Sequence, residues 1–467
     1  MKNKISFFLV IVFILSFVFG CATYYQKNIK FQNHLLSGEI EKAENILLKD
    51  KKAEKGKNKL LFYLNRGYIS WMLQNNNESI KHFTTADRII EDQQKNIALE
   101  ALTLISNPNV KPYKPEDFEI IMVNYFLALN YLLKGEYNEA IVECKRINIK
   151  LNQLNDKYKD HKNRYQRDAF AHNLMGLIYD AKKDYNNAFI AYRNAVEIYE
   201  EDYKKNFNVN IPEQLKWDLL RTAYKTGFNE DVRFYEKKFG LKYKHKTHNG
   251  GDLIIFWQNG FGPVKSEWSI NFTKVPGDEG WLTLVNDDLG LNFPIYIGNK
   301  SDNEKNAFAE LSLMRVAFPK YIEREPFYQS AEVIANNNNY KLELSENIND
   351  IAFKTLNDRM MRELANSLLR LATKKALEQL ANSQDENLGT ALSIANALTE
   401  KADTRNWQTL PYSVYYARIP LPVGQNKVNI KTYSKQNSED HFLNFDIKKG
   451  KTIFFAFQSI ESMPLKY

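Results

Sequence analysis

Apolar positions follow two different rhythms along this chain, and the change comes near Gly240. From about residue 30 to residue 240, apolar residues recur at spacings of three and four, which predicts amphipathic helices. After Gly240, short runs alternate between apolar and polar residues, which predicts β-strands. The pattern predicts an α+β, multidomain protein with an all-α domain over 30–240, a linker over 241–251 and an α+β domain over 252–467.

The expected strands are rich in β-branched and aromatic residues and are bounded by Gly, Pro and Asn, which favours a mainly antiparallel sheet. Leu356, Met360, Leu364 and Leu368 form a stripe at spacing four, so a helical pair is expected as an insertion at about 350–402. The strands are expected at 252–257, 267–274, 294–298, 313–318, 331–334, 340–344, 413–419, 427–433, 442–447 and 452–458.

Two segments of the helical region share one arrangement of small and aromatic residues. The first carries Ala128, Tyr131, Gly135, Tyr137 and Ala140, and the second carries Gly176, Tyr179, Asp184, Tyr185 and Ala188. Both resemble the tetratricopeptide repeat (TPR), in which small residues let two antiparallel helices touch. Gly135 relaxes the turn between the helices, and Asp184 is expected at the equivalent place. Weaker units are expected around Gly38, Gly67 and Gly227.

The resemblance implies a TPR-like solenoid, a curved stack with a concave face. In that family the residues that face the groove come from the first helix of each unit. Carried over, these positions include Tyr68, Trp71, Tyr125 and Leu129, which are apolar or aromatic. They form a candidate partner-binding groove. Either they bind a peptide or helix, or the C-terminal half of the chain covers them.

The first twenty residues have the pattern of a secretory signal. Lys2 and Lys4 are followed by an apolar run from Ile5 to Phe19, which is too short for a spanning helix. The segment 18–21, Val-Phe-Gly-Cys, resembles the lipobox of bacterial lipoproteins, although Phe19 is larger than the residue usual there. The resemblance implies a signal peptide over 1–20, lipidation of Cys21 and a lipidated tether over 21–29. Ala22, in place of Asp, favours the outer membrane.

Composition narrows the range of partners. Of 467 residues, 44% are hydrophobic and 26% are charged, with a net charge of +8, and Lys is interleaved with Asp and Glu. No dense basic run with aromatic residues is present, so a nucleic-acid partner is not expected. With lipid on Cys21, Cys144 has no disulfide partner and is expected as a small buried residue of a helix.

The sequence offers no convincing catalytic site, no cofactor motif and no metal site. His245 and His248 have ligand-like spacing, but Gly250 and Gly251 place them in or beside a linker. No nucleophile elbow or phosphate loop is present. Asp403, Arg405 and Trp407 form the most suggestive polar cluster. The favoured interpretation is structural, in which the two charged residues pair and the indole fills a core; the alternative is an anion site.

Several segments in a fixed order resemble an uncharacterised family of TPR-bearing bacterial envelope lipoproteins. They lie at 113–124, 258–265, 315–321, 402–411 and 417–424. The resemblance extends over nearly the whole chain beyond the signal. It implies a location in the cell envelope and no particular activity.

These observations leave three hypotheses. The first is a non-catalytic, membrane-anchored scaffold that binds an envelope protein or peptide. The second is a carbohydrate- or peptidoglycan-binding or hydrolytic envelope protein, in which Trp257, Trp268, Trp281 and Trp407 are exposed and line one cleft. The third is a permanent subunit of a larger assembly, which the sequence does not separate from the first. The oligomeric state is left open.

Overall fold

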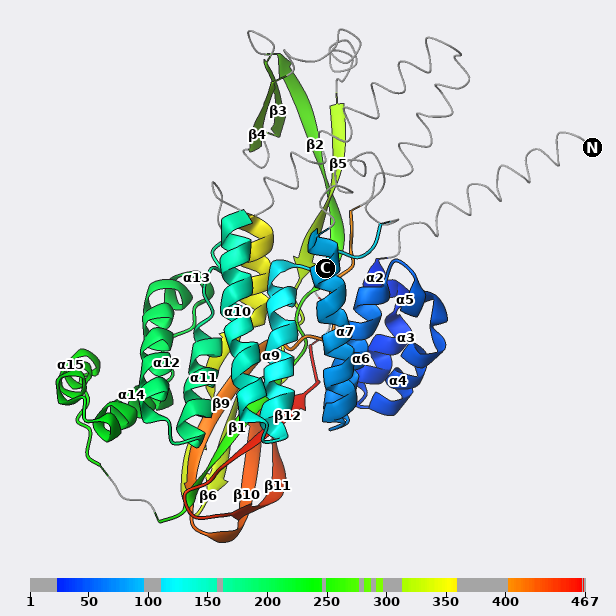
Figure 1. The fold of residues 1–467 in the computed structure, drawn as a ribbon. Coiled ribbons are helices and arrows are strands. Elements are labelled where there is room, and N and C mark those ends of the chain that lie inside the picture. Colours follow the sequence, from blue (N-terminus) through cyan, green and yellow to red (C-terminus); the bar gives the residue numbers. More distant parts are fainter. Residues whose placement is uncertain are drawn as a thin grey trace, which may run out of the picture.

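The computed structural model describes residues 23–95, 111–157, 163–245, 249–276, 281–286, 291–296, 313–358, 402–463 and 465. The signal segment and Cys21 lie outside these residues. The helices of the first half form an arc, with α2 to α5 at one end and α15 at the other (Figure 1). They are α2 (Tyr24–Lys27), α3 (Ile29–Leu36), α4 (Ile40–Lys49), α5 (Lys51–Lys55), α6 (Lys59–Met72), α7 (Asn76–Lys95), α9 (Asp117–Leu133), α10 (Tyr137–Lys157), α11 (Ala169–Ala181), α12 (Tyr185–Ile198), the π-helical turn η3 (Tyr199–Tyr203), α13 (Lys204–Phe207), α14 (Glu213–Thr226) and α15 (Asn229–Phe239).

The helices pair as α3/α4, α6/α7, α9/α10, α11/α12 and α14/α15, and each pair turns through one residue in the left-handed conformation. These residues are Gly38, Gln74, Gly135, Lys183 and Gly227, with φ between 59° and 80°. The position equivalent to Gly135 is therefore Lys183, which corrects the expectation that placed Asp184 there. Asp184 instead caps α12, because its side chain accepts a hydrogen bond from the Asn187 backbone N–H at 3.2 Å.

Glycine permits the closest helix contacts within these pairs. A Cβ atom on Gly176 would lie 2.3 Å from the ring of Tyr192, and one on Gly67 would lie 2.8 Å from the ring of Phe83. Both distances are shorter than van der Waals contact, so any side chain would push the paired helices apart. The role expected of Gly176 from the sequence is confirmed.

The region expected as a tether is already folded. Thr23 caps α2, and Tyr25 is buried against Val264 and Ile322 of the second half of the chain. The Tyr24 backbone N–H also donates to the Thr404 hydroxyl at 3.0 Å. Within the segment expected as a lipidated tether, 21–29, the described residues from Thr23 onward are thus packed against the folded chain.

Among the described residues of the second half, the strands form three sheets of four strands, where the sequence pattern led us to expect one mainly antiparallel sheet. Sheet A has the order β12-β1-β9-β8, sheet B the order β4-β3-β2-β5 and sheet C the order β11-β10-β6-β7. The strands are β1 (Gly251–Asn259), β2 (Val264–Pro276), β3 (Trp281–Asn286), β4 (Leu291–Tyr296), β5 (Leu313–Ile322), β6 (Ser330–Ala335), β7 (Asn338–Lys341), β8 (Glu343–Asn347), β9 (Ser413–Leu421), β10 (Gly424–Tyr433), β11 (Ser438–Ile447) and β12 (Thr452–Ser459).

Most sequence-expected strands coincide with an observed strand, with three differences. Strand β3 was not expected, and the run expected at 340–344 divides into β7 and β8. Strand β12 pairs with β1 in parallel, whereas the other ladders are antiparallel among the described residues. Of the expected helical insertion, residues 348–358 are helical and residues 359–401 lie outside the described residues.

Sheet A is covered on both faces. Leu253, Ile255 and Trp257 of β1 point into a sandwich core shared with sheet C, whereas Ile254 and Phe256 join the core of the helices. Because both faces are buried, β1 is a continuous apolar run and lacks the alternation of a half-exposed strand. In Figure 1, β9, β1 and β12 lie behind the helical arc, with the sandwich below it and sheet B projecting from the opposite end.

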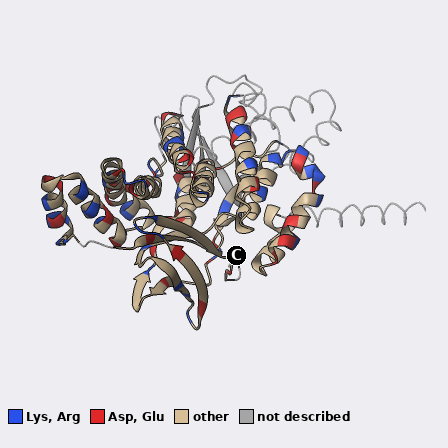
Figure 2. Ribbon diagram, turned by 60° about the horizontal axis from the view of Figure 1, so that its bottom comes forward, with Lys and Arg blue, Asp and Glu red and all other residues tan. Residues whose placement is uncertain are grey.

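The helical surface carries both signs of charge. Lys and Arg are interspersed with Asp and Glu along the helices (Figure 2). Within the described residues, no helix has both the length and the hydrophobicity needed to cross a membrane.

Candidate functional site: the inner surface of the helical repeats

The candidate groove residues lie on the inner helices of two neighbouring pairs. Tyr68 and Trp71 belong to α6, and Tyr125 and Leu129 belong to α9. All four are buried, with at most 5% of any of them exposed. The sequence had left two alternatives for these residues. For Tyr68 and Tyr125 the structure shows the second, in which the C-terminal half of the chain covers them. Trp71 packs on Tyr68 and Phe126 of the helices themselves. The candidate partner-binding groove is thus corrected to an internal interface.

Sheet A meets the groove through specific polar contacts. The Tyr68 hydroxyl donates to the Gln458 side-chain oxygen at 2.6 Å, and the Gln258 amide donates to the Tyr125 hydroxyl at 2.8 Å. Gln258 and Gln458 are direct neighbours in the parallel β1–β12 ladder. One rung of sheet A therefore binds two helices, and the buried tyrosine hydroxyls are satisfied by the chain itself.

Trp407 closes the groove from the loop before β9. Its ring is 1% exposed and packs beside Tyr68, Phe83 and Phe126, with centroid separations of 5.6 to 6.5 Å. Its backbone N–H donates to Glu119 Oε1 at 2.6 Å, and its indole N–H donates to the Thr409 hydroxyl at 2.8 Å. Trp407 is an aromatic plug of the helical core, as the structural interpretation of the sequence expected.

Arg405 and Asp403 pair beside this plug. The guanidinium donates twice to Asp403, at 2.6 and 2.8 Å, and once each to the Asn58 side chain and the Lys111 carbonyl. It also lies over the ring of Tyr113, at 5.6 Å. The donors of Arg405 are committed to the fold, which supports the structural interpretation of the Asp403, Arg405 and Trp407 cluster over the anion site.

A buried charge network joins the sheet to the last two helix pairs. Arg418 of β9 contacts Asp180 of α11 at 2.7 Å, Asp218 of α14 at 3.0 Å and Asp252 of β1 at 2.7 Å. Arg221 of α14 shares Asp180 and Asp218. The two guanidinium groups keep the pKa of the Asp180 carboxyl well below its usual range, although burial acts in the opposite direction.

A second buried group joins the first turn of α9 to β2. Lys265 forms an ion pair with Glu116, and both side chains are at most 4% exposed. Beside them, Glu119 accepts from the Tyr113 hydroxyl and from the Glu116 and Trp407 backbone N–H groups. Burial, together with the neighbouring Glu116 charge, raises the pKa of Glu119 to about 7. The sequence analysis missed this group, since the partners are far apart in sequence and none forms a motif.

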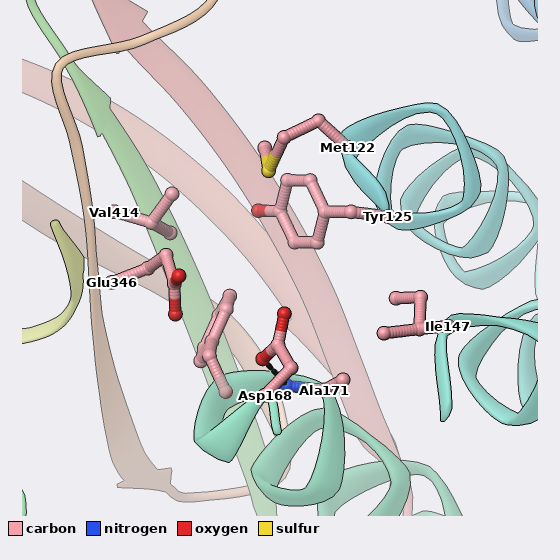
Figure 3. A pocket seen from close by; sticks show the side chains of 8 residues that line it. Met122, Tyr125, Ile147, Asp168, Ala171, Glu346 and Val414 are labelled. Carbon is pink, nitrogen blue, oxygen red and sulfur yellow. Dashed lines mark hydrogen bonds between the residues drawn. The ribbon is translucent and has the colours of Figure 1, made fainter. Parts of the chain in front are cut away.

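Two carboxyl groups face a small cavity between the helices and the sheet (Figure 3). Asp168 precedes α11 and caps it through the Ala171 N–H at 2.7 Å, and Glu346 comes from β8. Tyr165 donates to Asp168 at 2.7 Å, and Tyr203 donates to Glu346 at 3.1 Å. Burial raises the pKa of both carboxyl groups. The cavity of about 10 Å³ accommodates about one water molecule, which is too little for a ligand.

Two of the four tryptophan residues proposed to line one cleft are buried in separate cores. Trp257 and Trp407 are at most 1% exposed, and Trp268 is half-buried beside Phe318. The side chain of Trp281 lies outside the described residues. Because two of the four rings are inside separate cores, the hypothesis of one sugar-binding cleft is corrected.

The remaining candidate residues have ordinary surroundings. Cys144 is fully buried in α10, and burial raises the pKa of its thiol, which keeps it protonated. The ring of His245 stacks on Tyr224 at 4.9 Å, and His248 lies outside the described residues. Among the described residues, no three His, Cys, Asp or Glu side chains lie close enough together to hold a metal ion.

A comparison with known structures returned matches of low similarity. The apo form of RapI matches at 16% identity with a TM-score of 0.33, over 46% of this chain and 52% of that chain. MamA matches at 18% identity with a TM-score of 0.28, over 46% of this chain and 92% of that chain. BtubC from P. vanneervenii matches at 11% identity with a TM-score of 0.30, over 48% of this chain and 83% of that chain. The chain thus spans about half the length of RapI, and TM-scores this low do not support an argument about fold or function.

The sequence comparisons are more specific over a short region. A search of curated proteins found no relative of this chain. The tetratricopeptide repeat profile matches residues 171–202, which correspond to α11 and α12 with the turn that follows them. This pair contains the Gly176–Tyr192 contact and the left-handed turn at Lys183. The chain therefore bears a tetratricopeptide repeat.

Proposed function

We propose that this protein is a lipid-anchored, non-catalytic scaffold that mediates protein–protein interaction in the bacterial cell envelope. The observation that carries the proposal is the tetratricopeptide repeat at residues 171–202, within an arc of five helix pairs. Repeats of this kind present extended surfaces to other proteins. The lipid anchor on Cys21 and the envelope location, with the outer membrane favoured, rest on the sequence of the first residues.

The filled groove restricts how such a scaffold would work. The chain's own sheet binds Tyr68 and Tyr125, and Trp71 and Leu129 are buried near them, so a partner protein would bind an outer surface. The repeats then have two roles. Their inner surface holds the C-terminal sheets in place, and their outer surfaces and the sheet edges are left for partners.

The position of the folded N-terminus sets the distance to the membrane. Thr23 already caps α2, so one residue separates it from Cys21. At about 3.5 Å per extended residue, lipid on Cys21 would hold the folded part within roughly 10 Å of the membrane surface. We propose that the lipid keeps the scaffold close against the membrane with little freedom to reach away from it.

Crosslinking in intact cells tests the scaffold role. The full chain would be crosslinked, purified and compared with a second full chain in which the buried Arg418 is changed to Met to loosen the helix–sheet contact. We expect partner proteins that co-purify with the unaltered chain and are depleted from the variant. Recovery of the same proteins with both chains, or of none, would contradict a role for the repeat–sheet unit.

Mass spectrometry of the mature N-terminus tests the anchor. We expect Cys21 as the first residue with a mass that includes acyl chains, and accumulation of the precursor when cells are treated with globomycin. An unmodified Cys21 in the mature protein would overturn the anchor and leave the scaffold role to be judged by the crosslinking alone.

A further inference from the structure

Strand β12 forms an open edge of sheet A. It pairs with β1 on one side, and within the described residues no strand pairs with its other side. The Asp252 N–H donates to the Lys451 carbonyl and the Gly260 N–H donates to the Ser459 carbonyl. These two bonds determine which residues of β12 direct their backbone groups toward β1. The odd-numbered residues of β12 bond to β1, so the backbone N–H and C=O groups of residues 452, 454, 456 and 458 point away from β1, toward the open edge.

The edge of β12 lacks the features that normally keep a strand from pairing with other chains. Its eight residues, Thr-Ile-Phe-Phe-Ala-Phe-Gln-Ser, contain no charge, no Pro and no Gly. Charged side chains, bulges and short length are the usual safeguards of edge strands. An uncharged, aromatic edge of this length is suited to accept another strand.

The three other edge strands of the sandwich carry such safeguards. Strand β7 is four residues long, and β8 contains Glu343 and Glu346 and a register shift between Leu344 and Glu346. Strand β11 carries Glu439, Asp440, His441 and Asp446. Among the described edges of sheets A and C, β12 is therefore the exception, which favours a role of this edge in binding another strand.

Aromatic rings flank the open edge on both faces of the sheet. On the helical face, Phe454 meets Tyr137 edge-on, with centroids 6.0 Å apart. On the sandwich face, Phe455 packs against Phe445 and Phe457. Residues Thr452 to Gln458 are all half-buried, whereas Ile254, Ile255 and Phe256 of the adjacent β1 are fully buried. An added strand would cover the exposed part of these rings and extend both cores.

Positive charge gathers at the start of β12. Lys448, Lys449 and Lys451 are exposed in the turn that leads into the strand, and the Lys183 ammonium lies beside Gly450, 3.5 Å from where a Cβ would be. Such a cluster attracts a segment of opposite charge.

We propose that the edge of β12 binds an extended acidic segment of a partner protein, which adds to sheet A as an antiparallel fifth strand. Main-chain hydrogen bonds to residues 452 to 458 supply the affinity, and acidic residues at the C-terminal end of the segment meet the four lysines. Antiparallel addition places that end at the start of β12, where Lys448, Lys449 and Lys451 lie. This inference rests on the proposed scaffold function and names the kind of partner that it recruits.

A peptide-binding measurement on the full chain tests the inference. The probe is a fluorescent peptide of alternating valine and threonine that ends in three aspartates, and a second peptide ends in three lysines instead. We expect the acidic peptide to bind about tenfold more tightly than the basic one, measured by fluorescence anisotropy. Equal binding of the two peptides, or no binding of either, would overturn the inference.

Two variants separate the contribution of the β12 backbone to peptide binding from the contribution of the lysine charges. Ala456→Pro removes an outward N–H and leaves the bonds of β12 to β1 in place, so we expect it to abolish peptide binding. The double change Lys449→Glu and Lys451→Glu lies on exposed side chains and should weaken binding by about tenfold or more without affecting the fold. As a matched control, Lys204→Glu with Lys205→Glu alters two exposed lysines of α13 and should leave binding unchanged.

Other occupants of the edge give different results. Binding of anionic phosphatidylglycerol vesicles that depends on Lys449 and Lys451 but not on Ala456→Pro would overturn the peptide inference in favour of a lipid surface. Self-association that Ala456→Pro abolishes would overturn it in favour of a second copy of the chain. If crosslinked partners persist with the Ala456→Pro chain, the edge inference fails and the scaffold proposal stands.

Discussion

The charge network at Arg418 provides the sharpest test of how the helices and the sheet hold together. Arg418 contacts Asp180, Asp218 and Asp252 at 2.7 to 3.0 Å, and its side chain is 7% exposed. With Arg221, the network contains two guanidinium groups and three carboxylates. Replacing Arg418 with Met keeps the apolar stem and removes the charge, so two buried aspartates are left to share Arg221. Removing one partner of a buried pair typically costs about 3–5 kcal/mol.

Arg167 supplies a matched control at the surface. It also contacts three carboxylates, those of Glu197, Glu201 and Asp202, at 2.7 to 3.2 Å, but its side chain is 37% exposed and all its partners are on helices. Solvent screens these contacts, so Arg167→Met should cost about 0–1 kcal/mol. Arg167 and Arg418 are the same residue type and each contacts three carboxylates, so the two sites differ in burial and in position.

Urea unfolding, followed by circular dichroism and by tryptophan fluorescence, measures the loss in free energy of unfolding for Arg418→Met and for Arg167→Met. We expect the Arg418→Met transition to move to lower urea by several times the shift of Arg167→Met. We also expect the two signals to move together, because the network joins helices that dominate the first signal to sheets that hold Trp257. Equal shifts for the two variants would refute the reasoning, since the buried network would then contribute no more than a surface one.

Three further predictions concern the turns, the pH response and the aromatic plug. Lys183 occupies a left-handed turn with φ of 64°, so Lys183→Gly should raise the free energy of unfolding by about 1 kcal/mol, measured in urea, and a loss would show that the lysine side chain has a stabilising contact. The pKa of Glu119 is raised from 4.5 to about 7 in the folded protein, so its contribution to stability is present below pH 4.5 and is lost as the pH rises to 7. The free energy of unfolding should fall by about 3 kcal/mol between these two pH values. Glu119→Gln should reduce the fall in the urea midpoint over the same pH range. Trp407→Ala should lower the free energy of unfolding by about 3–5 kcal/mol, whereas the same change at Trp217, which is 38% exposed, should cost less than about 1 kcal/mol; equal costs in thermal unfolding would contradict the plug.

Local signals made the helices and most strands predictable. Spacings of three and four marked the helices, and Gly176 with Ala188 marked the close contact of one helix pair. Strand β1 was expected as an alternating run, whereas it is a continuous apolar run because both of its faces are buried. The equivalent of Gly135 was misplaced at Asp184, because a left-handed Lys183 has no sequence signature.

The pairing of strands that are distant in the sequence could not be predicted from one sequence. The parallel ladder joins β1 to β12, about two hundred residues later in the chain, and no local pattern specifies such a pairing. For the same reason the division into three sheets was missed. The candidate groove residues Tyr68 and Tyr125 lie on α6 and α9, but the residues that bind them, Gln258 and Gln458, lie in distant strands. The Lys265–Glu116 pair was missed because each partner alone is an ordinary charge.

Hydroxyl-radical footprinting of the purified full chain tests most directly whether the sheet fills the groove of the repeats. We predict that Tyr68 and Tyr125, at most 4% exposed, are modified far more slowly than Tyr224, which is 46% exposed. Each comparison is between side chains of one type, so intrinsic reactivity cancels. Modification of Tyr68 and Tyr125 at the rate of Tyr224 would show an open groove and would contradict the account.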